Sequence, residues 1–309
     1  MRTLCFGDAI VDLICHRPVA SYDDADAFVP ALGGVMANVA ATAARQGAAV
    51  SFAGGAGADR WGRWLHERLD AAGVDLRWFD LAKGHATAVA FTTVDKQGEP
   101  TWDLYGDGVA ASLEALDGLL LGAVEETDAL MFSSNTLADR SAAQLTMDAR
   151  ERALVLGRPV VFDPSVRLHR WRNSPSGAAA ACNACVPEAF LVKCNAAEAR
   201  FMTGESNPEA AAASLLAGGA KHAIVTLGSG GAILRAKGMR FDVPAPRPAR
   251  VLSTIGAGDV FLGVLIAQLG LTDYYPSALA AALPAAAEEA ARACERWGAL
   301  DDGSGGDIR

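Results

Sequence analysis

Short apolar runs alternate along the chain with longer, alanine-rich amphipathic segments. The short runs have the length and β-branched content of buried strands, whereas the longer segments repeat apolar residues at helical spacing. This pattern predicts strands at 4–10, 50–53, 129–132, 159–162, 190–193 and 223–227, and helices at 35–46, 60–72, 141–156, 196–202 and 208–217. Strands separated by helices of this length form βαβ units. We therefore predict an α/β fold, a three-layer sandwich in which helices cover both faces of a mostly parallel sheet.

Two segments interrupt this rhythm. Residues 15–32 contain short extended stretches without a convincing helix, and residues 86–105 resemble two strands, TAVAFTTV and PTWDLY, joined by a glycine-containing turn at 95–99. They predict a small antiparallel β lid, made of segments of about 13–32 and 86–107, that covers a site at the strand ends; an ordinary edge hairpin is the alternative. The lid belongs to one domain of residues 1–300, and the polar, glycine-rich tail 301–309 is predicted to be disordered.

Composition narrows the possible functions. The 309 residues are 51% hydrophobic, enough for one large domain, and the net charge of -9 argues against a broad nucleic-acid surface. The sequence contains no long uncharged apolar stretch, so no membrane span is predicted. Charged residues interrupt the apolar start, MRTLCFGDAIVDL, and we therefore expect a cytoplasmic protein. Six scattered cysteines are expected to be reduced thiols, and the Cys182 and Cys185 pair lacks the partners of a zinc site.

The most informative segment is STIGAGDVFLGVLIAQ at 253–268, where a Gly-Ala-Gly turn leads into an apolar helix. The first amides of a helix are unpaired donors at the positive end of its dipole, so Gly256, Ala257 and Gly258 would bind an anion such as a phosphoryl group. Asp259 lies in the first turn, where a carboxylate beside an anion hole can accept a hydroxyl proton. The alternative is a helix cap whose glycines only permit close packing.

From about Leu4 to Leu300 the chain resembles the ribokinase-like, or PfkB-type, carbohydrate kinases. The family's C-terminal signature, Asp-Thr-x-Gly-Ala-Gly-Asp, is matched by STIGAGD, and its N-terminal Gly-Gly and Asn are matched in GGVMANVAATAARQGA. The two signatures lie at opposite ends of the chain and each begins a predicted helix, so together they are specific.

The resemblance implies an enzyme that transfers the γ-phosphate of ATP to a small carbohydrate, with Asp259 as the catalytic base. It also implies that sugar hydroxyls bind to Asp12, Gly33, Gly34 and Asn38, while an aromatic residue of the lid, Tyr105, would contact the substrate. Amide and carboxylate groups suit a sugar, and paired glycines let its ring approach the main chain. Asn38 as an early helix residue and Asp12 as a turn residue are the structural alternatives.

Three further segments support the resemblance. FDPSVR resembles the family's Asp-Pro-Asn-x-Arg run and implies that Arg167 binds the transferred phosphate. LVKCNAAEARFMTG resembles its Asn-x-x-Glu segment, which implies that Glu198 orients Mg2+, through water. IVTLGSGGAIL resembles its nucleotide loop. A surface arginine, a helix cap and a tight hairpin are the alternatives. The residues assigned to the nucleotide are Asn195, Glu198, Thr226, Gly228 and Gly231.

Two departures bear on specificity. Ser253 replaces the family's Asp, which helps to bind a monovalent cation, so dependence on such a cation is in doubt. Asp107 follows Tyr105 and Gly106 where fructokinase and ketodeoxygluconate kinase relatives often carry Arg, and an acidic residue there disfavours a sugar acid and favours neutral sugars. The segment DPSVRLHRW resembles fructokinases more than ribokinases. Fructose is the expected substrate; 2-keto-3-deoxygluconate, ribose or a nucleoside, or a catalytically silent sugar-binding regulator, are the alternatives. A homodimer through the lid is also possible.

Dinucleotide-binding and Walker-type enzymes do not fit this sequence. No GxGxxG opens a helix after the first strand, and no GxxxxGK followed by Ser or Thr occurs. The resemblance implies a sugar, ATP and Mg2+ as partners, and neither nucleic acid nor membrane is expected.

Overall fold

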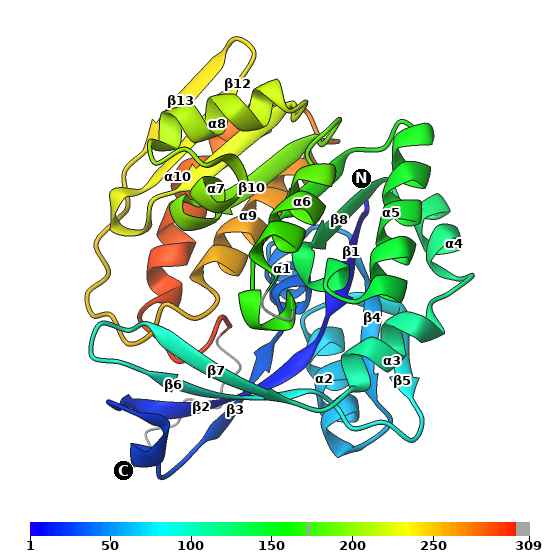
Figure 1. The fold of residues 1–309 in the computed structure, drawn as a ribbon, viewed down its shortest axis with the longest axis vertical. Coiled ribbons are helices and arrows are strands. Elements are labelled where there is room, and N and C mark those ends of the chain that lie inside the picture. Colours follow the sequence, from blue (N-terminus) through cyan, green and yellow to red (C-terminus); the bar gives the residue numbers. More distant parts are fainter. Residues whose placement is uncertain (172–173, 301–309) are drawn as a thin grey trace.

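The computed structural model describes residues 1–171 and 174–300 of the chain. The prediction for the tail 301–309 lies outside these residues. In the described part, a nine-stranded sheet runs in the order β13-β12-β11-β10-β9-β8-β1-β4-β5 through the centre (Figure 1). Its strands are β1 (Thr3–Asp8), β4 (Val50–Gly57), β5 (Asp75–Ala82), β8 (Ala129–Ser133), β9 (Val160–Asp163), β10 (Leu191–Asn195), β11 (His222–Thr226), β12 (Ala232–Ala236) and β13 (Met239–Val243).

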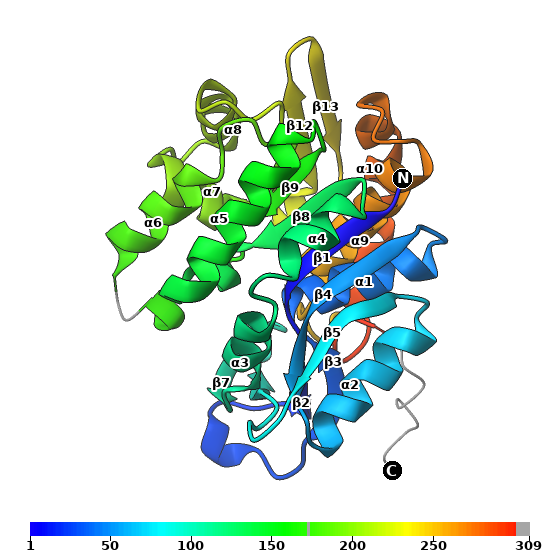
Figure 2. The same ribbon diagram turned by 90° about the vertical axis from the view of Figure 1, so that its right-hand side faces the viewer.

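Every pairing from β5 to β11 is parallel, and β12 and β13 add an antiparallel edge. Side chains alternate between two cores: Leu4 and Phe6 of β1 pack on one face of the sheet, and Cys5 packs on the other. A sheet with two apolar faces must be covered on both, and Figure 2 shows the helices on either side of it. The predicted three-layer α/β sandwich is confirmed.

One helical layer consists of α1 (Val35–Arg45), α2 (Arg60–Ala71), α9 (Ala257–Leu271) and α10 (Ser277–Ala293). The other consists of α3 (Gly108–Ala115), α4 (Leu120–Glu125), α5 (Arg140–Val155), α6 (Pro175–Ala184), α7 (Ala196–Thr203) and α8 (Pro208–Ala217). Short 3-10 turns are η1 (Tyr22–Asp24), η2 (Ser134–Leu137), η3 (Leu168–Trp171) and η4 (Gly228–Gly230). No helix in these described ranges is long and apolar enough to cross a bilayer.

A second, four-stranded sheet, the lid sheet, projects from one end of the molecule (Figure 1). It contains β2 (Ile10–Pro18), β3 (Val29–Gly33), β6 (Val89–Val94) and β7 (Pro100–Tyr105) in the order β3-β2-β6-β7. The predicted hairpin at 86–105 is present, and β2 pairs antiparallel with β3 but parallel with β6. The turn of the hairpin is tied to the main domain, because the Gly98 carbonyl accepts hydrogen bonds from Thr254 N at 2.9 Å and Thr254 Oγ1 at 3.2 Å.

Some element boundaries differ from the prediction. The apolar run 4–10 is divided between β1 and β2, because the chain leaves the central sheet after Asp8 and enters the lid sheet at Ile10. Strand β5 was not predicted, since this edge strand is mostly half-buried and carries polar residues. The α10 helix was also missed; it contains Pro284 and is held by packing along α9.

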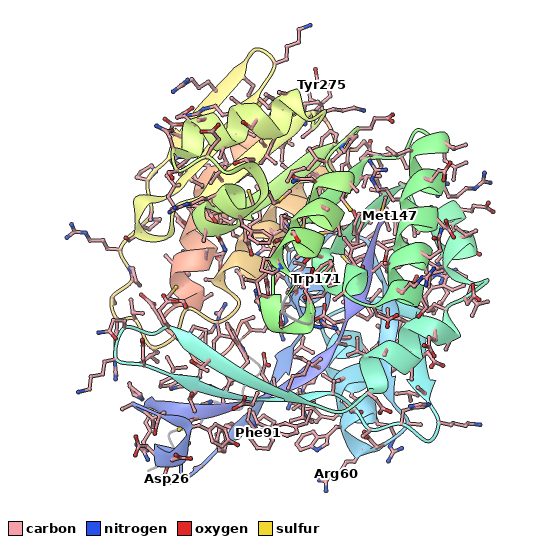
Figure 3. All side chains as sticks on the ribbon, viewed as in Figure 1. Asp26, Arg60, Phe91, Met147, Trp171 and Tyr275 are labelled. Atoms are coloured by element: carbon pink, nitrogen blue, oxygen red, sulfur yellow. The ribbon has the colours of Figure 1, made fainter. Side chains whose placement is uncertain are left out.

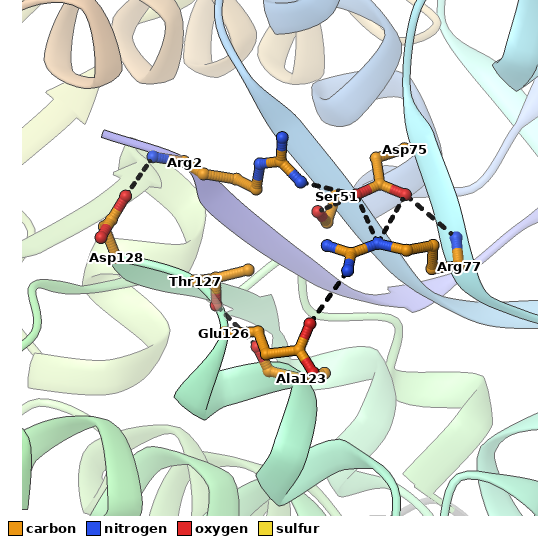
Figure 4. A network of polar contacts seen from close by, with 8 residues as sticks. All are labelled: Arg2, Ser51, Asp75, Arg77, Ala123, Glu126, Thr127 and Asp128. Atoms are coloured by element: carbon orange, nitrogen blue, oxygen red, sulfur yellow. Dashed lines mark hydrogen bonds and ion pairs between the residues drawn. The ribbon is translucent and has the colours of Figure 1, made fainter.

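Polar contacts fasten the amino ends of the strands (Figure 4). Asp75, which begins β5, accepts from Arg2 Nη1 at 2.7 Å and from Ser51 Oγ at 3.0 Å. Asp128, just before β8, accepts from the backbone amide of Arg2 at 2.7 Å. These bonds join neighbouring strands at the edge of the sheet opposite their carboxyl ends. The carboxyl ends are consequently the edge available for a ligand, as is general in parallel α/β sheets.

Candidate active site

Two helices from opposite ends of the sequence meet at this carboxyl edge. The α1 and α9 helices pack against each other, and a side chain at Gly263 would collide with Thr42, with 2.4 Å between the two Cβ atoms. At their amino ends, Asn38 Nδ2 donates to Asp259 Oδ2 at 2.9 Å across 221 positions of sequence. The convergence of the two predicted motifs is therefore direct contact.

The glycine before α1 is required by this arrangement. Gly34 has a φ of 94° and lies against the end of β1, where an added Cβ would be 2.4 Å from the Asp8 carbonyl oxygen. Gly33 lies beside Asp12, whose carboxyl carbon would be 2.5 Å from a Cβ at that position. The two glycines thus allow the chain before α1 to lie close to the main chain of Asp8 and to the carboxyl group of Asp12.

A cavity opens between the carboxyl ends of the strands and the lid sheet. Four elements contribute charged groups to it: β1, β2, the segment after β9, and α9. The cavity brings together six of the predicted residues. Its walls are formed by Asp8, Ile10, Asp12, Gly34, Val35, Asn38, Ala90, Trp102, Leu104, Asn135, Arg167, Arg170, Ile255, Gly256 and Asp259.

Asp259 is half-buried on the wall of this cavity. Burial raises its pKa to about 7, and the negative charge of Asp163 acts in the same direction, while the hydrogen bond from Asn38 and the positive charges of Lys193 and Arg167 oppose the rise. A carboxyl group with a pKa near neutrality can both accept and release a proton at physiological pH, as a general base requires.

Asp12 has a similar environment. Burial raises its pKa to about 7 as well, and the negative charges of Asp259 and Asp8 add to the effect, whereas Arg167 opposes it. The negative charges of Asp259 and Asp8 thus make the charged form of Asp12 less favourable. Two arginines also line the cavity, Arg167 and Arg170, and their positive charge counters the negative charge of these carboxyl groups.

The amino end of α9 has the geometry of an anion hole. Gly256 is the N-cap in a left-handed conformation with a φ of 72°, and no side chain caps the helix. It packs so closely on Ala299 that a Cβ at position 256 would be 2.2 Å from the Cβ of that residue. A 15-residue helix with uncapped first-turn amides suits a phosphoryl group. The anion hole at Gly256, Ala257 and Gly258 stays a prediction, and the Ala257 amide donates to the Thr254 carbonyl at 3.3 Å.

A buried ion pair lies beneath the anion hole, and sequence reasoning missed it. Lys193 Nζ donates to Asp163 Oδ2 at 3.0 Å, with side-chain exposures of 5% and 0%. The ammonium group lies against the helix start, since a Cβ at Gly258 would be 3.2 Å from Nζ. Burial alone would lower the pKa of Lys193, but Asp163 and Glu198 hold it above its ordinary value. The charge of Lys193 is thus retained close to where a phosphate would bind.

Arg167 reaches the cavity from the loop after β9. That loop is fixed by Asp163, whose Oδ1 accepts from Ser165 N at 3.0 Å and Ser165 Oγ at 3.1 Å. The guanidinium carbon of Arg167 lies 5.0 Å from the centre of the Trp102 ring, on the lid sheet. Arg167 therefore links the central sheet and the lid across the cavity.

Asn195 and Glu198 form a capping box at the start of α7. Asn195 Oδ1 accepts from Glu198 N at 2.9 Å, and Glu198 Oε2 accepts from Asn195 N at 2.9 Å. The second oxygen, Oε1, accepts from Val166 N at 3.2 Å, so both carboxylate oxygens already bind amides. Burial raises the pKa of Glu198, and Asp163 adds to the rise.

No group of three or more His, Cys, Asp or Glu side chains within residues 1–171 and 174–300 could hold a metal ion. Mg2+ seldom uses an all-protein site, and it usually binds together with a polyphosphate and keeps most of its waters. The contact of Glu198 with Mg2+ through water stays a prediction.

The remaining predicted nucleotide residues lie at the end of β11. Thr226 is its last residue, Gly228 begins the η4 turn, and Gly231 follows that turn and leads into β12. A side chain at Gly231 would be 1.9 Å from the Val243 carbonyl oxygen, so glycine is required by the hairpin itself. The structure places these residues at the same sheet edge as Asn195, outside the walls of the cavity.

Tyr105 does not line the cavity. Side chains alternate along β7, and Trp102 and Leu104 face the cavity, whereas Tyr105 is 59% exposed and contacts Phe91. Asp107 also lies elsewhere: its carboxylate accepts from His85 Nδ1 at 3.0 Å and Ala86 N at 3.1 Å. The expectation that Asp107 would repel an acidic sugar is therefore not supported by its position.

Three polar residues of the cavity were absent from the prediction: Asp8, Asn135 and Arg170. Asp8 carried a usable signal, because it ends the first strand of a parallel sheet, where ligands bind. Asn135 and Arg170 follow β8 and β9 in short turns, and no sequence spacing connects them with the motifs.

Comparisons with known proteins agree with this geometry. Residues 2–300 match the model of the pfkB family of carbohydrate kinases. The chain belongs to this family. It is therefore an ATP-dependent carbohydrate kinase, as the resemblance implied.

Several proteins similar to this chain are named fructokinases. Maize fructokinase-2 is 31% identical over 269 residues, which cover 87% of this chain and 80% of the relative, and a probable fructokinase-4 of Arabidopsis thaliana is 30% identical over 265 residues, covering 85% and 81%. Among solved structures, the fructokinase of Xylella fastidiosa with bound ATP has a TM-score of 0.82 at 27% identity, covering 96% of this chain and 93% of that one. A Vibrio cholerae fructokinase double mutant, in a form with fructose, ADP and potassium, has a TM-score of 0.82 at 26% identity with the same coverage.

Proposed function

We propose that this kinase phosphorylates a hydroxyl of a neutral sugar and that D-fructose is its substrate. The observation that carries the proposal is a set of buried oxygens in the cavity: Asp8 Oδ1, Asp12 Oδ1 and Asn38 Oδ1 have no hydrogen-bond partner within the described residues. Buried polar atoms are normally paired, so these acceptors call for a ligand rich in O–H donors.

A polyhydroxylated sugar supplies such donors, whereas a sugar acid would bring a negative charge toward Asp8, Asp12 and Asp259. The names of the maize and Arabidopsis relatives, and the fructose in the Vibrio cholerae structure, support a ketohexose. We infer that Asp12, Gly33, Gly34 and Asn38 form the sugar subsite, as predicted.

In the proposed mechanism Asp259 accepts the proton of the attacking hydroxyl. Asn38 orients the carboxylate through its hydrogen bond to Oδ2, which leaves Oδ1 for the substrate. The amides of Gly256, Ala257 and Gly258 stabilise charge on the phosphoryl oxygens as the group passes from ATP to the sugar, and Arg167 binds the same oxygens from the other side.

The nucleotide would lie along the carboxyl ends of β10 and β11, beside Thr226, Gly228 and Gly231. Asn195 and Glu198 would orient Mg2+ through its waters, and the ion would supply positive charge that stabilises the phosphates. Lys193 keeps its charge under the anion hole and holds Asp163, which in turn orders the loop that carries Arg167.

The Asp259→Asn variant tests the mechanism. It should lower turnover with fructose by about a hundredfold to ten thousandfold, because proton transfer loses its base. The fructose dissociation constant measured by calorimetry should change little, since Asn keeps the shape of Asp. A coupled ADP-release assay on wild type, with fructose, ribose, 2-keto-3-deoxygluconate and a nucleoside, identifies the substrate; near-normal turnover in the folded variant, or no turnover of any sugar by wild type, contradicts the proposal.

The pKa of Asp259 gives a pH dependence. The base must be ionised, and its pKa is raised to about 7, so kcat/KM should fall as pH drops below 7 and approach a tenfold loss per pH unit. The charged groups around it are Asp12, Asp163, Lys193 and Arg167. Initial rates from pH 5.5 to 9 at saturating magnesium-ATP measure the profile, and a flat profile between pH 5.5 and 8 would exclude Asp259 as the titrating base.

We further propose that the enzyme needs no monovalent cation. Ser253, which replaces the family's Asp, is fully buried, and its Oγ accepts from Ile255 N at 3.0 Å. A neutral hydroxyl engaged with the main chain supplies no carboxylate charge for a cation.

Activity should accordingly change less than about twofold when potassium replaces tetramethylammonium at constant ionic strength. Neutral hydroxyl ligands give little electrostatic stabilisation to a monovalent ion, which is the reason for the small effect. Rates in the two salts, compared at equal ATP and Mg2+, check this expectation; a tenfold activation by potassium would contradict it.

A homodimer through the lid sheet completes the proposal. The face of the lid that points away from the cavity carries an aromatic cluster of Tyr22, Phe28, Phe91 and Tyr105. The rings of the first three contact one another, and the Tyr105 ring contacts Phe91. Tyr22 and Tyr105 are 42% and 59% exposed. Exposed aromatic rings on a small sheet with edge strands favour contact with a second copy.

Light scattering with size-exclusion chromatography should show a dimer for wild type and a monomer for Tyr105→Lys, because the added charge would be buried in the contact. Tyr275→Lys is the matched control, since Tyr275 is 68% exposed and lies at the end of the molecule opposite Phe91 (Figure 3). A monomeric wild type, or a dimer that persists in Tyr105→Lys, would count against this arrangement.

A further inference from the structure

Asp8 and Asn135 form a polar pair on the wall of the cavity that the proposed mechanism does not use. Asp8 ends β1, and Asn135 lies in the η2 turn directly after β8, the parallel neighbour of β1. The carboxyl ends of adjacent parallel strands bring the two side chains together, and Asn135 Nδ2 donates to Asp8 Oδ2 at 3.3 Å. The exposed fractions are 5% for Asp8 and 7% for Asn135.

The second oxygen of Asp8 is the unusual atom. Asp8 lines the cavity, and its Oδ1 atom is buried and has no hydrogen-bond partner in the described ranges of the chain. A buried carboxylate oxygen without a donor is destabilising, so an ordered protein retains one chiefly where a ligand satisfies it. Asn135 holds the other oxygen and thereby fixes the direction in which Oδ1 points.

The position of Asp8 differs from that of the other sugar-binding carboxylate. Asp12 belongs to β2 of the lid sheet, whereas Asp8 belongs to the central sheet. The main chain at Asp8 is also held firmly, because its carbonyl lies against Gly34 at the start of α1. A ligand that binds both carboxylates therefore bridges the lid and the body of the enzyme.

We propose that Asp8 Oδ1, oriented by Asn135, accepts a hydrogen bond from a sugar hydroxyl other than the one that is phosphorylated, and so determines specificity. This inference rests on the proposed function, because it assigns a second hydroxyl of the same bound sugar. It names the substrate class as neutral sugars with a hydroxyl at that position; a deoxy sugar leaves Oδ1 unpaired, and a carboxylate there meets like charge.

The Asp8→Asn variant has a particular value as a test. Its amide would turn its oxygen toward the Asn135 amide, since two NH2 groups cannot bond each other, and its own NH2 would then face the cavity. The pocket-facing atom changes from acceptor to donor without a change of shape. Asp8→Ala removes the atom altogether. Asp117→Asn, at an exposed position remote from the cavity, is the matched control.

The experiment measures dissociation constants by calorimetry, and kcat/KM with magnesium-ATP, for D-fructose and its 1-, 3-, 4- and 6-deoxy analogues. Wild type should lose about tenfold to a hundredfold in affinity for the analogue that lacks the hydroxyl bound to Asp8. In Asp8→Ala and Asp8→Asn, fructose should bind as weakly as that analogue, so the penalty for this one deletion disappears while the penalties for the others remain. Asp117→Asn should behave as wild type.

Persistence of every deoxy penalty in both folded Asp8 variants would overturn the inference, since Asp8 would then have a purely structural role. Thermal unfolding identifies a variant that fails to fold, and the isosteric Asp8→Asn keeps the test valid if Asp8→Ala does so. Failure of the proposed function looks different: wild type itself would then neither bind nor phosphorylate fructose.

Discussion

The active site depends on the contact between α1 and α9. Their amino ends are joined by a hydrogen bond of 2.9 Å from Asn38 to Asp259, two residues that are 221 positions apart in the sequence. Close packing along the helices makes this bond possible, because only glycine fits at position 263 against Thr42. A hydrogen bond between side chains is short-ranged, so small changes in helix packing would separate the base from the sugar subsite.

Electrostatics around this contact are balanced rather than uniformly negative. Burial raises the pKa of Asp12 and Asp259 to about 7, while Lys193 and Arg167 favour the charged form of Asp259. In this site, carboxyl groups that titrate near neutrality lie beside a helix end suited to anions. The buried pair of Lys193 and Asp163 connects the two features, since it lies against Gly258 and orders the loop of Arg167.

The lid sheet contributes to the site through alternation of its side chains. Trp102 and Leu104 of β7 face the cavity, whereas Tyr105 turns to the outer aromatic cluster. One residue of difference along a strand decides between the substrate side and the opposite face. The family resemblance led to the choice of Tyr105 as the residue that contacts the substrate. The alternation within PTWDLY separates the side chains into two faces, but it does not show which face points into the cavity.

Local sequence determined the class of the fold and its two motifs. The alternation of apolar runs and helical segments, and the glycines before Asn38 and Asp259, are encoded within short windows, because backbone conformation and helix-end chemistry are local properties. Only tertiary structure decided which polar groups share the cavity. Asp8 ends β1 and Asn135 lies in the turn after β8, so their contact depends on strand order, which no spacing along the chain reveals. The same holds for the buried pair of Lys193 and Asp163 from β10 and β9.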